Sequence, residues 1–179
     1  MENEHILLTE LSEALRKKEF CFYLQPQVNM QNNKIVGAEA LVRWNHKEKG
    51  VVSPGKFIPI LEKNGHIVDL DKYIWEEVCK WQHSLIMRGI KPVPVSVNVS
   101  RLDIMFLDVA KFFADMLKKY HITSHLIEIE ITETAYIQGY EEILATVAEL
   151  HQLGFKVLMD DFGSGYSVTV QPLAKSPIS

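Results

Sequence analysis

Apolar and polar positions recur along this chain at two spacings, one typical of helices and one typical of strands. Strict two-residue alternation in "LIEIEITE" (126–133) predicts a strand, and apolar residues three or four positions apart in 109–120 predict a helix. The same reasoning predicts further strands at 20–30, 34–44, 93–100 and 155–160, and further helices at 6–17, 69–88 and 141–153. The strand at 20–30 is expected to degrade at Pro26, and the helix after Gly65 to be capped by Asp69.

Shorter features complete this outline. "QNN" supplies a turn between the first two strands, which should form a hairpin. Residues 46–55 read as a loop, 56–64 as one or two helical turns, and part of 168–176 as a last helix. Because strands then alternate with helices, we expect βα units around a largely parallel sheet. No repeat, low-complexity tract or linker divides the chain, so 1–179 is interpreted as a single domain.

Composition narrows the class of protein. The net charge of −4 gives no overall basic field that would attract nucleic acid or an anionic membrane. Cys21 and Cys79 suggest ordinary thiols rather than a disulfide scaffold or a zinc cluster. No leader follows Met1 and no apolar run approaches the ~20 residues of a membrane span. We therefore expect a cytoplasmic chain, although a longer protein that contains it could be membrane-anchored.

Polar side chains share one face of strand after strand. Glu39, Leu41 and Arg43 lie on one face of their strand, because side chains alternate along it. Ser96 and Asn98 lie opposite the valines of the next strand. In "LIEIEITE" the isoleucines should pack against helices, which leaves Glu128, Glu130 and Thr132 on the polar face, with Glu133 just beyond. Parallel strands are normally apolar on both faces, so this repeated polar face indicates a site.

The strand "FKVLMD" ends on Asp160 and Asp161, followed by the glycine-rich "FGSGYS". Any one of these acidic residues, taken alone, is more often solvated or salt-bridged than functional. Several carboxylates that face each other, however, cannot all stay ionised without a counter-charge. Hard divalent cations bind carboxylate and amide oxygens, and adjacent aspartates suit a site with two metals. In βα barrels such sites are built at the C-terminal ends of the strands.

Six segments resemble the EAL domain family in order and spacing. Glu39, Ala40 and Leu41 form the Glu-Ala-Leu signature within "GAEALVRW". The other five are "LQPQV", "SPGKFIPILEKNG", "VNVS", "IEIEITET" and "DDFGSGYS", so the match covers about 20–167. The resemblance implies a modified (β/α)8 TIM barrel whose first strand is antiparallel. It also implies hydrolysis of the bacterial second messenger cyclic di-GMP to linear pGpG with Mg²⁺ or Mn²⁺.

The resemblance also implies roles for individual residues. Glu39, Asn98, Glu130 and Asp160 look like catalytic ligands of one metal, and Asp161 like a ligand of a second metal beside the attacking water. Gln25, Leu41 and Arg43, together with Asp161, look like substrate-binding residues, and Glu133 like the residue that holds the "DFGSGYS" loop. Arg43 suits a phosphate because its planar guanidinium donates two bonds at once.

The chain also departs from the family pattern. Leu24 replaces a usual tyrosine, and 168–179 is an atypical tail after a leading helix (1–19) and the family segments. A barrel of this kind needs about 250 residues and eight strands, whereas this sequence of 179 residues supplies five or six strands. The family has a later lysine, a second catalytic glutamate and a late glutamine, and none of these has a counterpart here. Lys175 lies in the wrong context to be that lysine.

Two functions therefore stay open: an impaired phosphodiesterase, or an inactive domain that binds cyclic di-GMP or a protein partner as a regulator. Open sheet edges, one beside the first strand and one beside the strand that ends at Asp161, predict a homodimer or higher oligomer.

Overall fold

The computed structural model describes residues 2–131, 140–159 and 168–169 of the 179-residue chain. The strands are β1 (Phe20–Asn29), β2 (Lys34–His46), β3 (Gly50–Val52), β4 (Val95–Val99), β5 (Ile127–Ile131), β6 (Lys156–Met159) and β7 (Val168–Thr169). The helices are α1 (Glu2–Arg16), α2 (Ile58–Lys63), α3 (Ile67–Met87), α4 (Arg101–Phe106), α5 (Val109–Tyr120) and α7 (Tyr140–Gln152), with 3-10 turns at Pro54–Lys56 and Ser124–Leu126. None of the described helices is long and apolar enough to cross a membrane.

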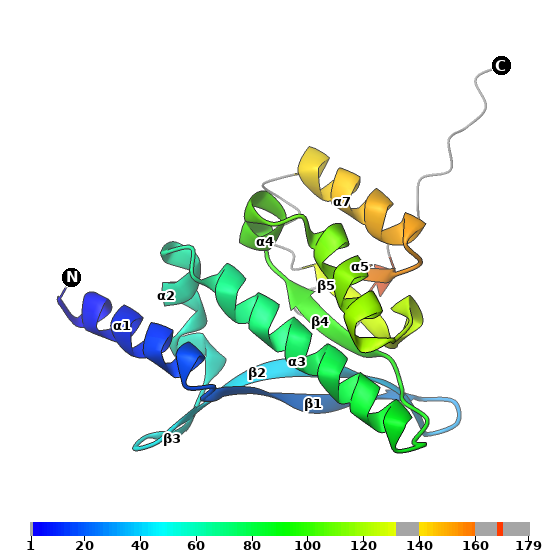
Figure 1. The fold of residues 1–179 in the computed structure, drawn as a ribbon, viewed down its shortest axis with the longest axis horizontal. Coiled ribbons are helices and arrows are strands. Elements are labelled where there is room, and N and C mark those ends of the chain that lie inside the picture. The colour runs from blue at the N-terminus through cyan, green and yellow to red at the C-terminus, as the bar shows by residue number, and fades with distance from the viewer. Residues whose placement is uncertain (1, 132–139, 160–167, 170–179) are drawn as a thin grey trace.

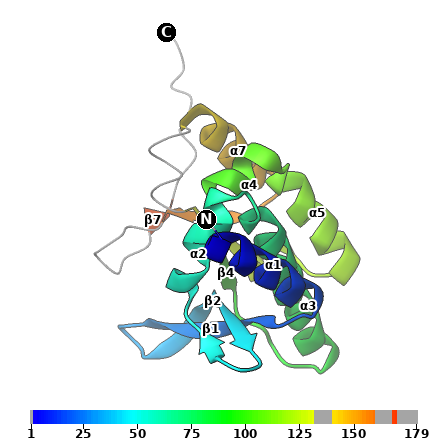
Figure 2. The same cartoon turned by 90° about the vertical axis from the view of Figure 1, so that its left-hand side faces the viewer.

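The described strands form one sheet in the order β1-β2-β4-β5-β6-β7, with β3 paired to β2. β1 and β2 make the predicted antiparallel hairpin, and β2, β4, β5 and β6 run parallel. The helices cover one face of this curved sheet, as Figures 1 and 2 show. The chain is therefore a mixed α/β fold with a partial barrel sheet and an antiparallel first strand, as predicted.

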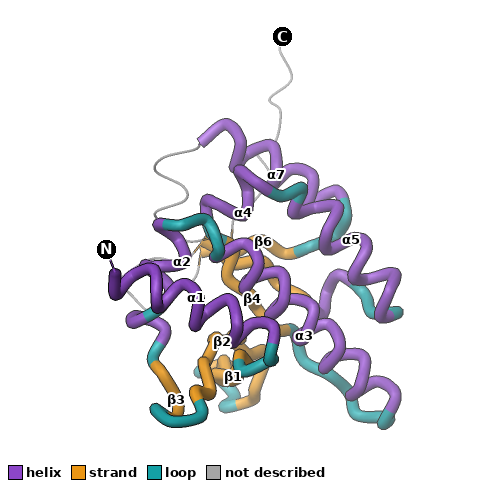
Figure 3. The backbone as a smooth tube through the Cα atoms, turned by 60° about the vertical axis from the view of Figure 1, so that its left-hand side comes forward, coloured by secondary structure: helices purple, strands orange, loops and turns teal. Residues whose placement is uncertain are grey.

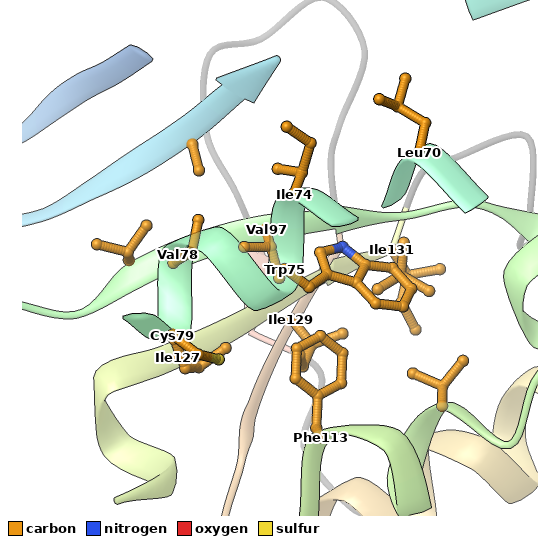
Figure 4. Close-up of a cluster of buried hydrophobic side chains, with 14 of the residues drawn as sticks. Leu70, Ile74, Trp75, Val78, Cys79, Val97, Phe113, Ile127, Ile129 and Ile131 are labelled. Atoms are coloured by element: carbon orange, nitrogen blue, oxygen red, sulfur yellow. The ribbon is translucent and has the colours of Figure 1, made fainter. Parts of the chain in front are cut away.

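The core lies between that face of the sheet and the helices; Figure 3 shows β1, β2 and β3 at one edge of the molecule, with the helices to one side of them. Alternation places Ile127, Ile129 and Ile131 of β5 on the helix side, where they are at most 1% exposed, which confirms the prediction. Trp75 and Val78 of α3 pack onto these strands beside Phe113 of α5, as Figure 4 shows. This burial supplies the main favourable term in folding.

One buried amide joins α3 to the N-terminal ends of two strands. Gln82 is fully buried, and its Nε2 donates to the carbonyl oxygens of Val93 (2.8 Å) and Leu126 (3.0 Å). These carbonyls lie just before β4 and β5. The side chain thus satisfies two buried acceptors that would otherwise destabilise the fold.

Helix α1 is attached to the β2–β3 turn by a small polar cluster. The Glu10 carboxylate lies 2.6 Å from Nε2 of His46 and 3.0 Å from Nζ of Lys49. Nδ1 of His46 accepts the backbone N–H groups of Glu48 and Lys49, so Nε2 carries the ring proton and donates to Glu10. Hydrogen bonds from His46 and Lys49 hold the pKa of Glu10 below its ordinary value.

Several predicted boundaries were wrong. β1 continues through Pro26 to Asn29, because proline is tolerated in a strand whose described residues pair on one side only. α3 begins at Ile67, so Asp69 lies in its first turn; Gly65, at φ 74°, already turns the chain. The predicted loop 46–55 contains β3, which is too short to show a pattern.

Two further elements differ from the prediction. α4 was missed, although Ser100 and Asp103 form a capping box at its start. Val168–Thr169, at the start of the segment in part of which a last helix is expected, form β7, which pairs antiparallel with β6. The sheet edge expected to be open beside β6 is therefore paired at Leu158 and Met159.

Candidate functional site

Three predicted ligands come together on neighbouring strands. Ala40 lies beside Val97 in the parallel β2–β4 ladder, which places Glu39 and Asn98 near the same edge. Asn98 lies directly beside Glu130 in the β4–β5 ladder. Because the three strands are parallel, these side chains gather toward one end of the sheet.

A direct hydrogen bond links the first two of these residues. Nδ2 of Asn98 donates to Oε1 of Glu39 over 3.1 Å. This bond orients the amide, since its nitrogen faces Glu39 and its oxygen remains as an acceptor. Glu130 is 3% exposed, whereas Glu39 and Asn98 are half-buried. The three side chains thus place oxygen atoms that could act as metal ligands between the buried core and the solvent-exposed surface.

The backbone of Asn98 is held from the helix side. Nε1 of Trp75 in α3 donates to the Asn98 carbonyl oxygen over 3.0 Å. Trp75 is 1% exposed and packs its ring against Phe113, with 4.9 Å between centroids. A buried donor from α3 thus reaches the strand that carries a predicted ligand.

A cavity of about 450 Å³ lies beside these residues. Four predicted site residues line it, together with residues from α2, α3 and the end of β4: Glu39, Leu41, Arg43 and Asn98, with Glu62, Asp71, Trp75 and Ser100 among the others. Its size suits a small molecule rather than a macromolecular surface.

The β1–β2 hairpin brings Gln25 and Arg43 to the same region. Gln25 is the direct cross-strand partner of Glu39, so their side chains share a face. The Arg43 guanidinium donates to the Val42 carbonyl oxygen at 2.8 Å and lies 5.6 Å from the centroid of the Tyr23 ring. A half-buried cation is therefore fixed at the cavity wall.

The cavity lining also contains two acidic residues, Glu62 and Asp71. The carboxyls of Asp71 in α3 and Asp103 in α4 share a hydrogen bond. Burial raises the pKa of Asp71 well above its ordinary value, and the nearby charge of Asp103 raises it further. Oδ2 of Asp103 accepts from the N–H and the hydroxyl of Ser100, each over 2.7 Å. Asp71 therefore carries the shared proton, and Asp103 is the acceptor. Burial likewise raises the pKa of Glu62.

A second polar pair lies further down the same strands. Glu128 accepts from Nζ of Lys156 over 2.9 Å, and the two residues are partners in the β5–β6 ladder. Glu128 is thus neutralised within the sheet and lies two residues before Glu130. Of the two β5 glutamates, Glu128 is held in an ion pair with Lys156, and Glu130 lies beside Asn98 in the β4–β5 ladder.

Not every predicted site residue can be placed. Asp160, Asp161 and Glu133 lie outside the described residues. Within the described part of the chain, no three His, Cys, Asp or Glu side chains are grouped closely enough to hold a metal ion. Glu39, Asn98 and Glu130 still fit a hard cation, because two carboxylates and one amide supply only oxygen ligands.

Sequence reasoning missed Asp71, Trp75 and Tyr23. Asp71 and Trp75 occupy a helix whose apolar stripe indicates only core. The bond from Trp75 to Asn98 and the position of Asp71 in the cavity lining both depend on the packing of α3. Tyr23 carried a usable signal, since it lies two residues from Gln25 and therefore on the same face of β1.

Comparisons with known proteins agree with this geometry. The model of the EAL domain matches residues 8–178. The bifunctional diguanylate cyclase/cyclic di-GMP phosphodiesterase MucR of Pseudomonas aeruginosa is 32% identical over 162 residues, which cover 90% of this chain and 24% of MucR. An uncharacterized protein of Mycobacterium tuberculosis strain H37Rv is 35% identical over 164 residues, which cover 91% of this chain and 53% of that protein.

Solved structures give the same result. A MucR phosphodiesterase in complex with cyclic di-GMP superposes with a TM-score of 0.82 at 29% identity, over 90% of this chain and 66% of that chain. The EAL enzyme Bd1971, with cAMP and cyclic di-GMP bound, gives 0.81 at 28% identity, over 92% and 46%. The chain thus spans only part of the proteins it matches, and it belongs to the EAL domain family.

Proposed function

We propose that this chain binds cyclic di-GMP in the cavity beside Glu39 and Asn98 and hydrolyses it to linear pGpG in a metal-dependent reaction. The observation that carries the proposal is the convergence of Glu39, Asn98 and Glu130 on adjacent strand ends, next to a cavity with a fixed arginine. MucR and Bd1971, which share this fold at 28–29% identity, have been solved with cyclic di-GMP bound.

The charges of the cavity suit the two parts of this ligand. Arg43 offers a delocalised cation to a phosphate, and its stacking on Tyr23 limits the freedom lost on binding. The base of guanine carries N–H donors, and the carboxyl of Glu62 in the cavity lining provides acceptors for it. Gln25, opposite Glu39, adds an amide that can both donate and accept.

Glu39, Asn98 and Glu130 would hold Mg²⁺ or Mn²⁺, together with Asp160 and Asp161, which we propose as ligands from the family pattern. A bound divalent ion would polarise the phosphoryl oxygens and lower the pKa of a water molecule. Glu130 is 3% exposed, so bulk solvent has little access to its carboxylate. The bond from Asn98 to Glu39 keeps both side chains in place before any ligand arrives.

A second function is also consistent with these contacts. A domain that retains the cavity but does not cleave the ligand would act as a cyclic di-GMP-binding regulator. The cavity and its fixed arginine are sufficient for this alternative, because binding alone does not need the metal ligands.

Two measurements on the same preparation separate these functions. Calorimetry with cyclic di-GMP and Mn²⁺ reports binding, and chromatography of the reaction mixture reports pGpG. Binding with pGpG release that Glu39→Ala abolishes supports the enzyme, whereas binding without release supports the regulator. Absence of both binding and release would overturn the proposal.

A further inference from the structure

Trp75 makes a contact that its place in the core does not require. An indole can be buried against Phe112 and Phe113 in many orientations, but this one directs Nε1 at the carbonyl oxygen of Asn98, 3.0 Å away. Figure 4 shows the ring between α3 and the strands, beside Ile131 and above Phe113. The donor therefore reaches the strand end that carries a predicted ligand.

The carbonyl oxygen of Asn98 lies near the C-terminal end of β4. The β2–β4 ladder ends at the pair Ala40 and Val97, so Asn98 lies one residue beyond it, although Asn98 still pairs with Glu130 of β5. An indole N–H supplies a donor there. The bond from Trp75 fixes the orientation of the peptide group that follows Asn98. This orientation limits the backbone angles of Asn98 and therefore the direction of its side chain.

The side chain of Asn98 continues the same series of contacts. Its Nδ2 donates to Oε1 of Glu39 over 3.1 Å, which leaves the amide oxygen as the atom available to a cation. Trp75, Asn98 and Glu39 thus form a connected series in which each member orients the next. Trp75 is 1% exposed and packed between aromatic rings, so its own orientation is fixed.

We propose that Trp75 is a positioning residue, which holds Asn98 so that its side-chain oxygen can bind a divalent cation. This inference rests on the proposed metal-dependent function. The Trp75 ring also lines the cavity, but in this proposal it touches no metal and acts on the metal site only through Asn98. Groups that orient metal ligands in this way typically change metal affinity about 10- to 100-fold when they are removed.

Removal of the indole N–H tests the proposal. Trp75→Phe keeps an aromatic ring but lacks the donor, and 3-benzothienylalanine at the same position keeps the shape of the bicyclic ring as well. Mn²⁺ affinity is measured by the electron paramagnetic resonance signal of free Mn²⁺, with thermal unfolding as a check on the fold. We expect both variants to bind Mn²⁺ about 10-fold more weakly than the wild-type chain.

Trp44→Phe is the matched control. Trp44 is 2% exposed and its Nε1 also donates to an oxygen, Oε2 of Glu19 at 3.2 Å, but that acceptor is not a predicted ligand. This variant should lose stability and keep its Mn²⁺ affinity within twofold. Wild-type affinity in the folded benzothienyl variant would overturn the inference alone. A wild-type chain that binds no Mn²⁺ would overturn both the inference and the metal-dependent function.

Discussion

Asp71 of α3 and Asp103 of α4 share a proton where these two helices pack against each other. Burial raises the pKa of both carboxyls, but two hydrogen bonds from Ser100 oppose the rise at Asp103, so Asp71 retains the shared proton. The folded chain therefore binds a proton at Asp71 that the unfolded chain releases once the pH exceeds about 4. This difference ties the stability of the fold to pH.

The free energy of unfolding should fall as the pH rises above the ordinary pKa of Asp71, 3.8, toward its raised value in the folded state. The slope for one proton is at most about 1.4 kcal/mol per pH unit. Asp71→Asn keeps a donor for Asp103 and cannot ionise, so it should flatten this decline. Urea unfolding of both proteins between pH 5 and pH 8 measures the difference.

Asp69→Asn is the control for that experiment, because Asp69 is an exposed carboxylate on the same helix. Its pH dependence should follow that of the wild-type chain. A constant difference in stability between Asp71→Asn and wild type at every pH would contradict a shared proton.

The two glutamates of β5 allow a matched test of metal binding. Glu130→Gln removes a charge from the ligand group and should abolish the thermal stabilisation that millimolar Mn²⁺ gives the wild-type chain. Glu128→Gln, two residues away, breaks an ion pair with Lys156 and should retain the stabilisation. Equal responses of the two variants in a thermal scan would count against the proposed ligand set.

Arg43 offers a test of ligand recognition. Arg43→Lys keeps the charge but loses the planar guanidinium, so cyclic di-GMP affinity should fall about 10-fold. Tyr23→Phe keeps the aromatic face under the guanidinium and should change the affinity much less. Calorimetry measures both; an unchanged affinity in Arg43→Lys would exclude a bidentate contact with phosphate.

How far the sequence predicts this fold depends on the element. The alternation around Ile129 gave the strand, its buried face and the polar face of Glu130, because period two is directly visible in the residues. β3 and β7 were missed or misassigned because strands of three and two residues contain no period. Pro26 misled because its cost depends on whether a strand lies at a sheet edge, which is a tertiary property.

The same division applies to the candidate site. Glu39 and Asn98 were predictable because parallel strand ends meet at one edge, and their hydrogen bond agrees with that reasoning. Trp75 and Asp71 could not be predicted, since helical spacing shows which residues face the sheet but not which atom each one reaches. Long-range packing of α3 decides these contacts.

Gln82 gives a prediction about stability. Gln82→Leu preserves volume but leaves the carbonyl oxygens of Val93 and Leu126 without this donor, so it should cost about 2–4 kcal/mol. Gln152→Leu, at the exposed end of α7, should stay within about 0.5 kcal/mol. Chemical denaturation measures both variants, and a small effect at Gln82 would show that water satisfies these carbonyls.

Self-association stays a prediction. Among the described residues β1 pairs only with β2, and the same hairpin exposes Val28, Met30 and Ile35. An unpaired edge with apolar residues favours contact with a second copy, so we expect a dimer. Light scattering during size-exclusion chromatography tests this, and a monodisperse 20.5 kDa species with cooperative unfolding would contradict it.

The buried amide of Gln82 has a mechanical consequence for the molecule. It anchors α3 at the start of β4, while Trp75 anchors the same helix at the end of β4. The two anchors are seven residues apart, about two helical turns or roughly 10.5 Å. A rod held at two separated points can neither slide along nor roll over the surface beneath it. Any movement that opens or closes the cavity must therefore leave α3 in place as the fixed wall.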